Sequence, residues 1–230
     1  MKRYFSATDI IGNACSIMNK NLLMFLIVYI LMEIVSSIFN SFAAPNLSMF
    51  TTYKASELQE LYSMLSNTYL SPWAWVSVLV QVVFMVGLSK MAFNAIDGKK
   101  AGFDAFKMPI EVYLNFIATW IIYVFIVCVG LAFCILPGIF LAIRLEFTPF
   151  YMIDKNLSID EAFKESWRNT SGNFWHLLGT NILFSIFAMA GFLLCCVGAF
   201  YTFPAFYVAL CLLTRVFSNN EQVEEAYTYE

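Results

Sequence analysis

Three ionisable residues lie inside long apolar stretches of this sequence: Glu33, Arg144 and Glu146. A charge buried in membrane hydrocarbon costs at least about 2.5–3.5 kcal/mol, so such side chains normally face a partner or water. One interpretation is an ion pair between Glu33 and Arg144 that locks two membrane helices together. The other is a polar site for an anionic headgroup or a coupling ion, which Glu146 would tune. Positions 144 and 146 are about 200° apart on a helix, so they cannot both face one point.

A second set of candidate residues is basic and lies between the apolar stretches: Lys99, Lys100, Lys107, Lys164 and Arg168. Basic loops mark the cytoplasmic side of membrane proteins, and the same side chains can contact anionic lipid headgroups. The net charge is −3, and no basic patch is large enough for nucleic acid. We therefore expect membrane lipids as partners and no nucleic acid, while protein partners stay unknown.

Metal and enzyme chemistry have little support in the residue types present. The sequence has 6 Cys and 1 His, with no CxxC pair and no ligand near His176, so we expect no metal site and no cofactor. The apolar stretches hold no paired Asp, Ser/Lys or His-rich metal motif, so we expect no enzyme. Cys134, Cys195 and Cys196 fall near predicted outer turns, where free thiols are the favoured interpretation and a disulfide is the alternative.

The elements that carry these side chains must be membrane helices. Hydrophobic residues make up 60% of the 230-residue chain and charged residues 13%, whereas soluble domains average about 45–50% and about 25%. Residues 112–143 contain no charged side chain, and neither do residues 169–214 apart from one histidine. A span needs about 20 apolar residues, so the second stretch is long enough for two. The sequence predicts an integral membrane protein.

Six spans, in one membrane domain covering residues 1–230, account for the apolar stretches. They are predicted at about 21–42, 72–93, 112–134, 136–153, 174–198 and 200–217. We expect Pro137-Gly138 to break one long apolar run and Gly198 to mark another break, because Pro removes a backbone donor and Gly permits turn geometry. The predicted fold is therefore all-α, with six transmembrane helices in three hairpins.

Charge asymmetry predicts the orientation of these spans. Eleven of the 13 basic residues fall on one side, which predicts that this side and both termini are cytoplasmic. The segment 43–71 becomes an outer loop, in which Ser56-Glu57-Leu58-Gln59 has the pattern of a capping box that opens a short helix. Residues 218–230 form an acidic C-terminal tail.

A threefold repeat is predicted from the segments before the odd-numbered spans. Each is polar-capped and amphipathic and leads from an Asp to an Asn: Asp9 to Asn21, Asp104 to Asn115, and Asp160 to Asn173. The third contains a capping box at Ser158 and Glu161, whereas Pro109 interrupts the second. We expect three parallel units, each an amphipathic cytoplasmic helix followed by a hairpin. The alternative is chance similarity in a chain that alternates loops with spans.

The segment 137–175 carries a family resemblance through Pro137-Gly138, Arg144, Ala162, Ser166-Trp167 and Gly172-Asn173-Phe174-Trp175. It resembles a superfamily of prokaryotic membrane proteins related to the membrane domain of glycerophosphoryl diester phosphodiesterases. The resemblance implies a six-helix protein of the prokaryotic cytoplasmic membrane. Those phosphodiesterases hydrolyse substrate in a separate soluble domain with acidic ligands and histidines, and we expect no such chemistry from these 230 residues, which contain 1 His. The resemblance therefore implies localisation and not hydrolase activity.

Two functions are compatible with these features. The first is binding or moving lipids or amphiphilic solutes in the cell envelope. The second is a structural or regulatory membrane anchor for partner proteins, with no transport activity. A polar cavity near the middle of the membrane would favour the first function, and a solid apolar bundle would favour the second.

Overall fold

The structure is a computed structural model that describes residues 6–43, 71–193 and 197–228, and in these residues all regular structure is helical. The elements are α1 (Ala7–Lys20), α2 (Leu22–Ala43), α4 (Pro72–Ile96), the 3-10 helix η3 (Phe103–Phe106), α5 (Ile110–Phe133), α6 (Ile135–Leu145), α7 (Thr148–Lys155), α8 (Ile159–Thr170), α9 (Phe174–Leu193) and α10 (Val197–Thr228). Six segments are long and apolar enough to cross a membrane: Leu22–Phe42, Pro72–Ile96, Ile110–Phe133, Ile135–Lys155, Phe174–Gly191 and Phe200–Ser218. The predicted all-α protein with six candidate spans is confirmed to this extent.

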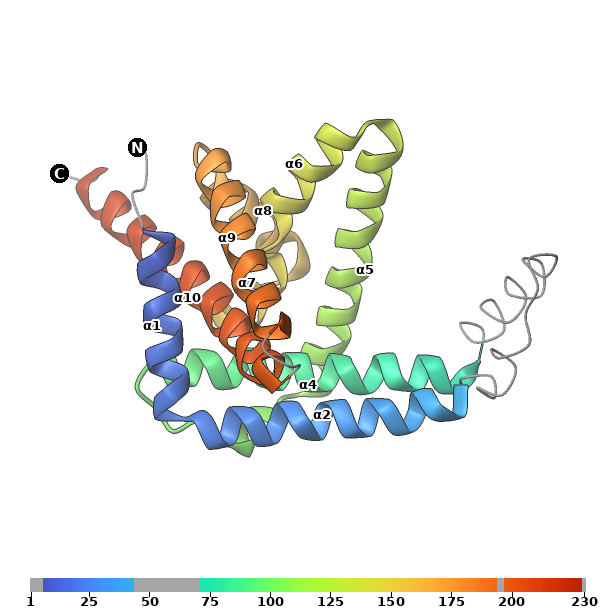
Figure 1. The fold of residues 1–230 in the computed structure, drawn as a ribbon. Coiled ribbons are helices and arrows are strands. Elements are labelled where there is room, and N and C mark those ends of the chain that lie inside the picture. The colour runs from blue at the N-terminus through green and yellow to red at the C-terminus, as the bar shows by residue number, and fades with distance from the viewer. Residues whose placement is uncertain (1–5, 44–70, 194–196, 229–230) are drawn as a thin grey trace.

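Consecutive spans pack on one another in pairs, and the helix axes of different pairs are not parallel. α2 lies along α4, α5 packs against α6, and α9 packs against α10 (Figure 1). The α2–α4 pair runs steeply across the direction of α5, and α1 turns sharply away from α2 to lie against α10 (Figure 1). Buried side chains of α1, α4, α7 and α10 meet in the core, among them Met18, Phe93, Tyr151 and Phe217.

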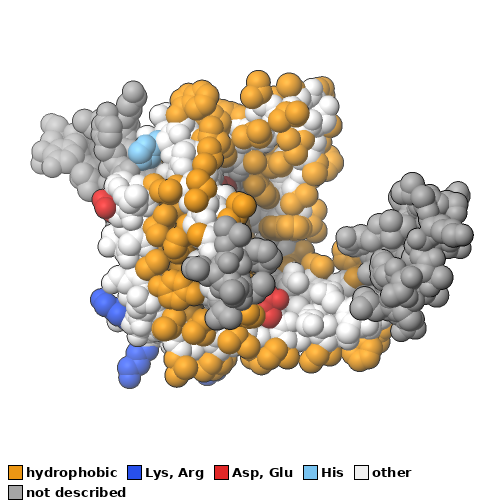
Figure 2. Space-filling model, viewed as in Figure 1, with side chains coloured by type: hydrophobic (Ala, Val, Ile, Leu, Met, Phe, Trp, Pro, Cys, Tyr) orange, Lys and Arg blue, Asp and Glu red, His pale blue; other side chains and the backbone are white. Residues whose placement is uncertain are grey.

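Large apolar side chains also cover the outside of the molecule. Leu23 on α2, Phe125 on α5 and Met189 on α9 are all exposed, and hydrophobic side chains spread over much of the face shown in Figure 2. A soluble monomer rarely exposes so extensive an apolar surface. The surface is the one expected of helices that face lipid.

The turn between α5 and α6 differs in detail from the prediction. The break lies at Cys134, and Pro137 and Gly138 fall inside the first turn of α6. Proline is tolerated there because the first N–H groups of a helix have no intrahelical partner. Gly138 serves close packing: a Cβ on it would lie 2.7 Å from the backbone nitrogen of Leu131 in α5. Small residues at such positions allow membrane helices to approach closely.

Two of the three segments predicted to be amphipathic helices are helical. α1 buries Ile10, Ala14 and Met18 on one face. α8 begins with the predicted capping box, in which Ser158 and Glu161 satisfy each other's backbone N–H groups.

In the second unit the expectation of a helix is wrong. η3 is only four residues long, and residues 107–109 that follow it are not helical. Pro109 gives the reason, because a proline disfavours the helical conformation in the residue before it. The sequence had already marked this unit as the weakest of the three.

The C-terminal region also differs from the prediction. α10 runs without interruption from Val197 to Thr228, so most of the predicted tail continues the last helix. The outer loop with its predicted capping box falls almost wholly outside the described residues.

Candidate functional site

The fourth span is not a continuous helix, and the interruption carries an acidic side chain. α6 ends at Leu145 and α7 begins at Thr148, so Glu146 and Phe147 lie between them, near the middle of the span Ile135–Lys155. Pro149 lies in the first turn of α7, where it cannot donate the hydrogen bond that would continue α6. In membrane proteins, interrupted helices are tolerated where they are buried in protein or line a cavity.

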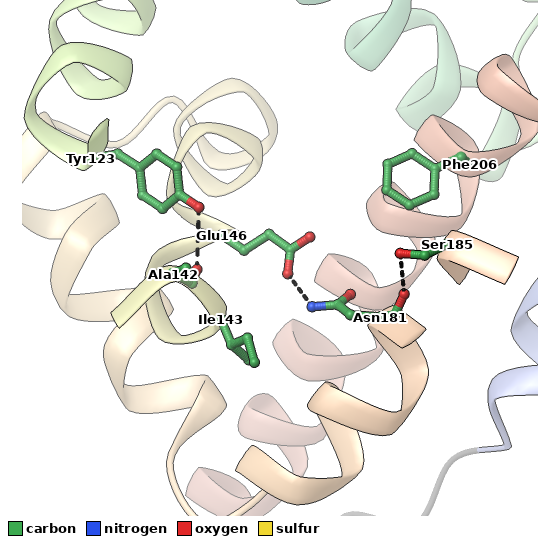
Figure 3. Close-up of a pocket in the computed structure, with 7 residues that line it drawn as sticks. All are labelled: Tyr123, Ala142, Ile143, Glu146, Asn181, Ser185 and Phe206. Carbon is green, nitrogen blue, oxygen red and sulfur yellow. Dashed lines mark hydrogen bonds between the residues drawn. The ribbon is translucent and has the colours of Figure 1, made fainter. Parts of the chain in front are cut away.

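Glu146 lines a pocket of about 220 Å³ formed by four helices and the break. Its walls are Tyr123 from α5, Ala142 and Ile143 from α6, Asn181 and Ser185 from α9, and Phe206 from α10 (Figure 3). The pocket therefore combines apolar walls with a small group of polar atoms. Binding sites for small molecules typically have this composition.

Hydrogen bonds of differing length connect the polar atoms of the pocket. The Asn181 amide donates to a Glu146 carboxylate oxygen over 2.6 Å. The Tyr123 hydroxyl donates to the carbonyl of Ala142 over 3.4 Å, and the Ser185 hydroxyl donates to the carbonyl of Asn181 over 2.8 Å (Figure 3). Glu146 is held by a neutral donor, and no lysine or arginine of the described chain forms an ion pair with it. Its carboxylate can accept a hydrogen bond from a ligand, bind a cationic group or take up a proton.

The predicted ion pair between Glu33 and Arg144 is wrong. Glu33 is exposed on α2 and bonds to Tyr29, one helical turn earlier on the same helix. Arg144 lies against α8 instead: its guanidinium is 4.2 Å from the ring centroid of Trp167 and donates to the Ser171 hydroxyl over 3.0 Å. Both residues lie near the middle of their predicted spans. Position along a span does not decide which neighbour a side chain contacts, because that also depends on the rotation of each helix about its axis.

The structure also separates Arg144 from Glu146. Arg144 does not line the pocket, and the two side chains have different partners. The helical spacing of positions 144 and 146 predicted this separation. A single polar site built from Glu33, Arg144 and Glu146 therefore does not form.

Most of the basic side chains considered for lipid contact are paired with nearby acids. Lys99 lies 3.8 Å from Asp97 and Lys107 lies 2.7 Å from Asp104. Lys164 lies 2.6 Å from Asp160, and Arg168 lies 2.7 Å from Glu165. Lys100 is exposed and forms no ion pair with a described residue. The pairs of Lys107 and Lys164 are exposed on both sides and therefore weak in water, so these side chains can still exchange partners at a membrane surface.

Another charged group, the Arg215 cluster, consists of Arg215, Asp97 and Asp154. Arg215 of α10 lies 2.8 Å from Asp154 at the end of α7 and 3.2 Å from Asp97 directly after α4. The Asp154 side chain is only 3% exposed. The cluster joins the ends of three spans. Sequence reasoning did not single out any of these three residues as part of a site.

The sequence missed most of the pocket. Asn181 and Ser185 are polar residues spaced i, i+4 in a stretch without formal charge, and this spacing puts them on one helix face. That pattern was a usable signal. Tyr123 and Phe206 gave none, because aromatic residues are frequent throughout the chain.

The remaining candidates for metal or redox chemistry are few. In the part of the chain that the structure describes, no group of three or more His, Cys, Asp or Glu side chains could hold a metal ion. Cys134 is a free thiol among the described residues, whereas Cys195 and Cys196 lie outside them. For these three cysteines, free thiols therefore stay the favoured prediction and a disulfide stays the alternative.

Comparison with known proteins does not indicate a function, so the function is argued from the site. No protein-family model matches the sequence, and neither the curated proteins nor the solved structures gave a match.

Proposed function

We propose that this multi-pass membrane protein binds, and through binding moves, lipids or amphiphilic solutes, and that the pocket around Glu146 receives their polar ends. The observation that carries the proposal is an uncompensated carboxylate in an open pocket at the break of a candidate span. Transporters commonly place substrate sites where a membrane helix is interrupted near the bilayer midplane. A solid apolar bundle would have offered no such site.

The pocket's size and chemistry indicate which part of a ligand it would take. About 220 Å³ is below the roughly 300–1,000 Å³ of sites that enclose a drug-sized molecule. It fits a headgroup, while an alkyl chain would remain against the exposed apolar faces of the spans. Because Glu146 has no cationic partner among the described residues, a headgroup with an amine or ammonium would supply the missing charge.

We place this activity in three transmembrane hairpins of a prokaryotic cytoplasmic membrane, with both termini cytoplasmic and no catalytic step. The packing of α2 on α4, α5 on α6 and α9 on α10 supports the hairpins. The basic residues of the loops support the orientation, and the resemblance to the phosphodiesterase membrane domain supports the localisation.

A pair of matched probes tests the binding proposal. Dodecylamine and dodecanol share a chain and differ in charge, and their retention on the purified protein can be measured by native mass spectrometry. We expect the wild type to retain the amine about tenfold more strongly, and Glu146→Gln to abolish this preference. Glu33→Gln is the control, because it removes another carboxylate within a span that does not line the pocket. Equal retention of both probes by the wild type would overturn the proposal, as would a preference that survives in Glu146→Gln.

The orientation has its own test. Leu58→Cys and Lys100→Cys, each on a cysteine-free background, should be labelled from opposite sides of the membrane. An impermeant thiol reagent on intact cells should reach position 58 and not position 100. Labelling of position 100 without permeabilisation would overturn the proposed topology and leave the binding proposal untouched.

One feature favours the alternative function of an anchor for partner proteins. α8 presents a charged outer face in which Asp160 and Lys164 are both largely exposed, and such a face can contact a soluble partner. These charges already pair with one another, however. The Glu146 carboxylate, which has no cationic partner among the described residues, is therefore the stronger indication of function.

A further inference from the structure

We propose a second binding site, at Arg144 and the turn between α8 and α9, that takes the phosphate group of an anionic lipid or a free phosphate ion. It is independent of the Glu146 pocket, since Arg144 is not among the pocket's lining residues. Its basis is a buried cation whose charge no described residue neutralises, placed beside the start of a long helix.

Arg144 is 7% exposed, and its guanidinium forms no ion pair with an acidic residue of the described chain. Its guanidinium makes one side-chain hydrogen bond, from Nη2 to the Ser171 hydroxyl over 3.0 Å, and its buried Nε has no partner. A buried polar group without a partner is costly and rare in native proteins. A guanidinium has five donors, so most of its capacity is unused.

Two aromatic rings stabilise the cation without using those donors. The Arg144 guanidinium carbon lies 4.2 Å from the centroid of the Trp167 ring and 5.3 Å from that of Phe140. Such contacts offset part of the desolvation cost. They also restrict the orientation of a planar group whose fork of N–H donors matches two oxygens of a phosphate.

The adjoining turn adds donors of a different kind. Ser171 and Gly172 are exposed, and Gly172 has a φ of 79°, a conformation that suits glycine. α9 follows and is 20 residues long. The first N–H groups of such a helix have no intrahelical partner, and its dipole favours an anion. Ser171 accepts from Arg144, so its own proton remains available for a phosphate oxygen.

The surroundings are suited to a phosphate group that carries acyl chains. Trp167 is 43% exposed and Trp175 is 80% exposed, on either side of the turn. A tryptophan ring is apolar over most of its surface and has one polar N–H. A lipid phosphate at Arg144 would therefore have its acyl chains beside exposed apolar rings.

Three probes separate the sources of the phosphate. They are dihexanoyl phosphatidylglycerol, inorganic phosphate, and dihexanoylglycerol, which lacks phosphate. Binding to the purified protein in a nonionic detergent is measured by isothermal titration. We expect the phospholipid to bind at least about tenfold more tightly than dihexanoylglycerol. Tight binding of inorganic phosphate would identify the free ion as ligand, and tight binding of the phospholipid alone would identify the lipid.

Variants of Arg144 and Ser171 locate the site. Arg144→Gln should weaken binding of the preferred probe at least about tenfold, and Arg144→Lys should weaken it less because the charge remains. Ser171→Ala, at an exposed turn, carries the test if Arg144→Gln does not fold, and should weaken binding about threefold. Lys20→Ala, which removes an exposed positive charge at the end of α1, is the charge-matched control and should change nothing. The proposal is overturned if neither phosphate-bearing probe binds better than dihexanoylglycerol, or if both Arg144→Lys and Ser171→Ala bind as the wild type does.

Discussion

The Arg215 cluster and the interior of the spans differ in whether their charged side chains have partners of opposite charge. In the Arg215 cluster one arginine holds two aspartates from two other spans within 3.2 Å. Within the spans, no described residue of opposite charge pairs with the ionisable side chains: Glu146 bonds to the amide of Asn181, the exposed Glu33 bonds to Tyr29, and Arg144 contacts a hydroxyl and two aromatic rings. The Arg215–Asp154 pair neutralises its own charge and has a structural role, whereas Glu146 and Arg144, which no described residue neutralises, are available to a ligand. The difference indicates where the protein is held together and where it binds.

The largest expected effect comes from breaking the Arg215 cluster. Arg215→Ala leaves the buried Asp154 carboxylate without its cation, and losing one partner of a buried pair costs about 3–5 kcal/mol. We expect a large fall in thermal unfolding temperature in detergent. Arg215→Leu combined with Asp154→Leu should recover most of that loss, because apolar side chains often replace a buried pair without cost. Equal losses in the single and double variants would show that the cluster is not a structural link.

Glu146→Gln should do the opposite and leave stability unchanged or increase it. The glutamine keeps an acceptor for Asn181 and removes a charge that costs at least about 2.5–3.5 kcal/mol within a membrane. The measurement is the thermal unfolding temperature of Glu146→Gln, compared with those of the wild type and of Arg215→Ala under the same conditions. A fall as large as that of Arg215→Ala would mean that Glu146 is paired in the folded protein, and the contrast between the two regions would fail.

Trp167→Ala should have an intermediate effect. It removes the nearer of the two rings over Arg144, worth about 0.5–2 kcal/mol. A double-mutant cycle with Arg144→Gln isolates this coupling from the loss of the ring itself. Purely additive losses would show that the ring does not stabilise the guanidinium, which would weaken the account of how an unpaired arginine is tolerated.

The smallest expected destabilisation concerns the exposed charges of α8. The Ser158 hydroxyl and backbone N–H hydrogen-bond to Glu161 and lower the pKa of that carboxyl below its ordinary value of 4.5. A depressed folded pKa gives stability that is present above pH 4.5 and is lost as the pH falls through the folded pKa. Ser158→Ala should reduce this acid sensitivity and destabilise α8 by about 1 kcal/mol. The measurement is the helical signal between pH 6 and pH 3, with Lys20→Ala as an exposed control on α1.

Local chemistry made part of this molecule predictable from its sequence. The spans follow from composition, because about 20 apolar residues suffice to cross a bilayer. The capping box at Ser158 and Glu161 follows from residues only three apart, whose geometry depends on nothing beyond one helical turn. Pro109 also acts locally, and it marked in advance the unit that lacks a full helix.

What the sequence determined about the site was only which ionisable residues lie inside spans. Tertiary structure decided everything that involves two helices: Asn181 as the partner of Glu146, Trp167 and Ser171 around Arg144, and the meeting of Asp97, Asp154 and Arg215. The physical reason is that spacing along a helix fixes the direction of one side chain relative to another on the same helix. It does not fix the rotation and crossing of separate helices, which depend on packing throughout the molecule.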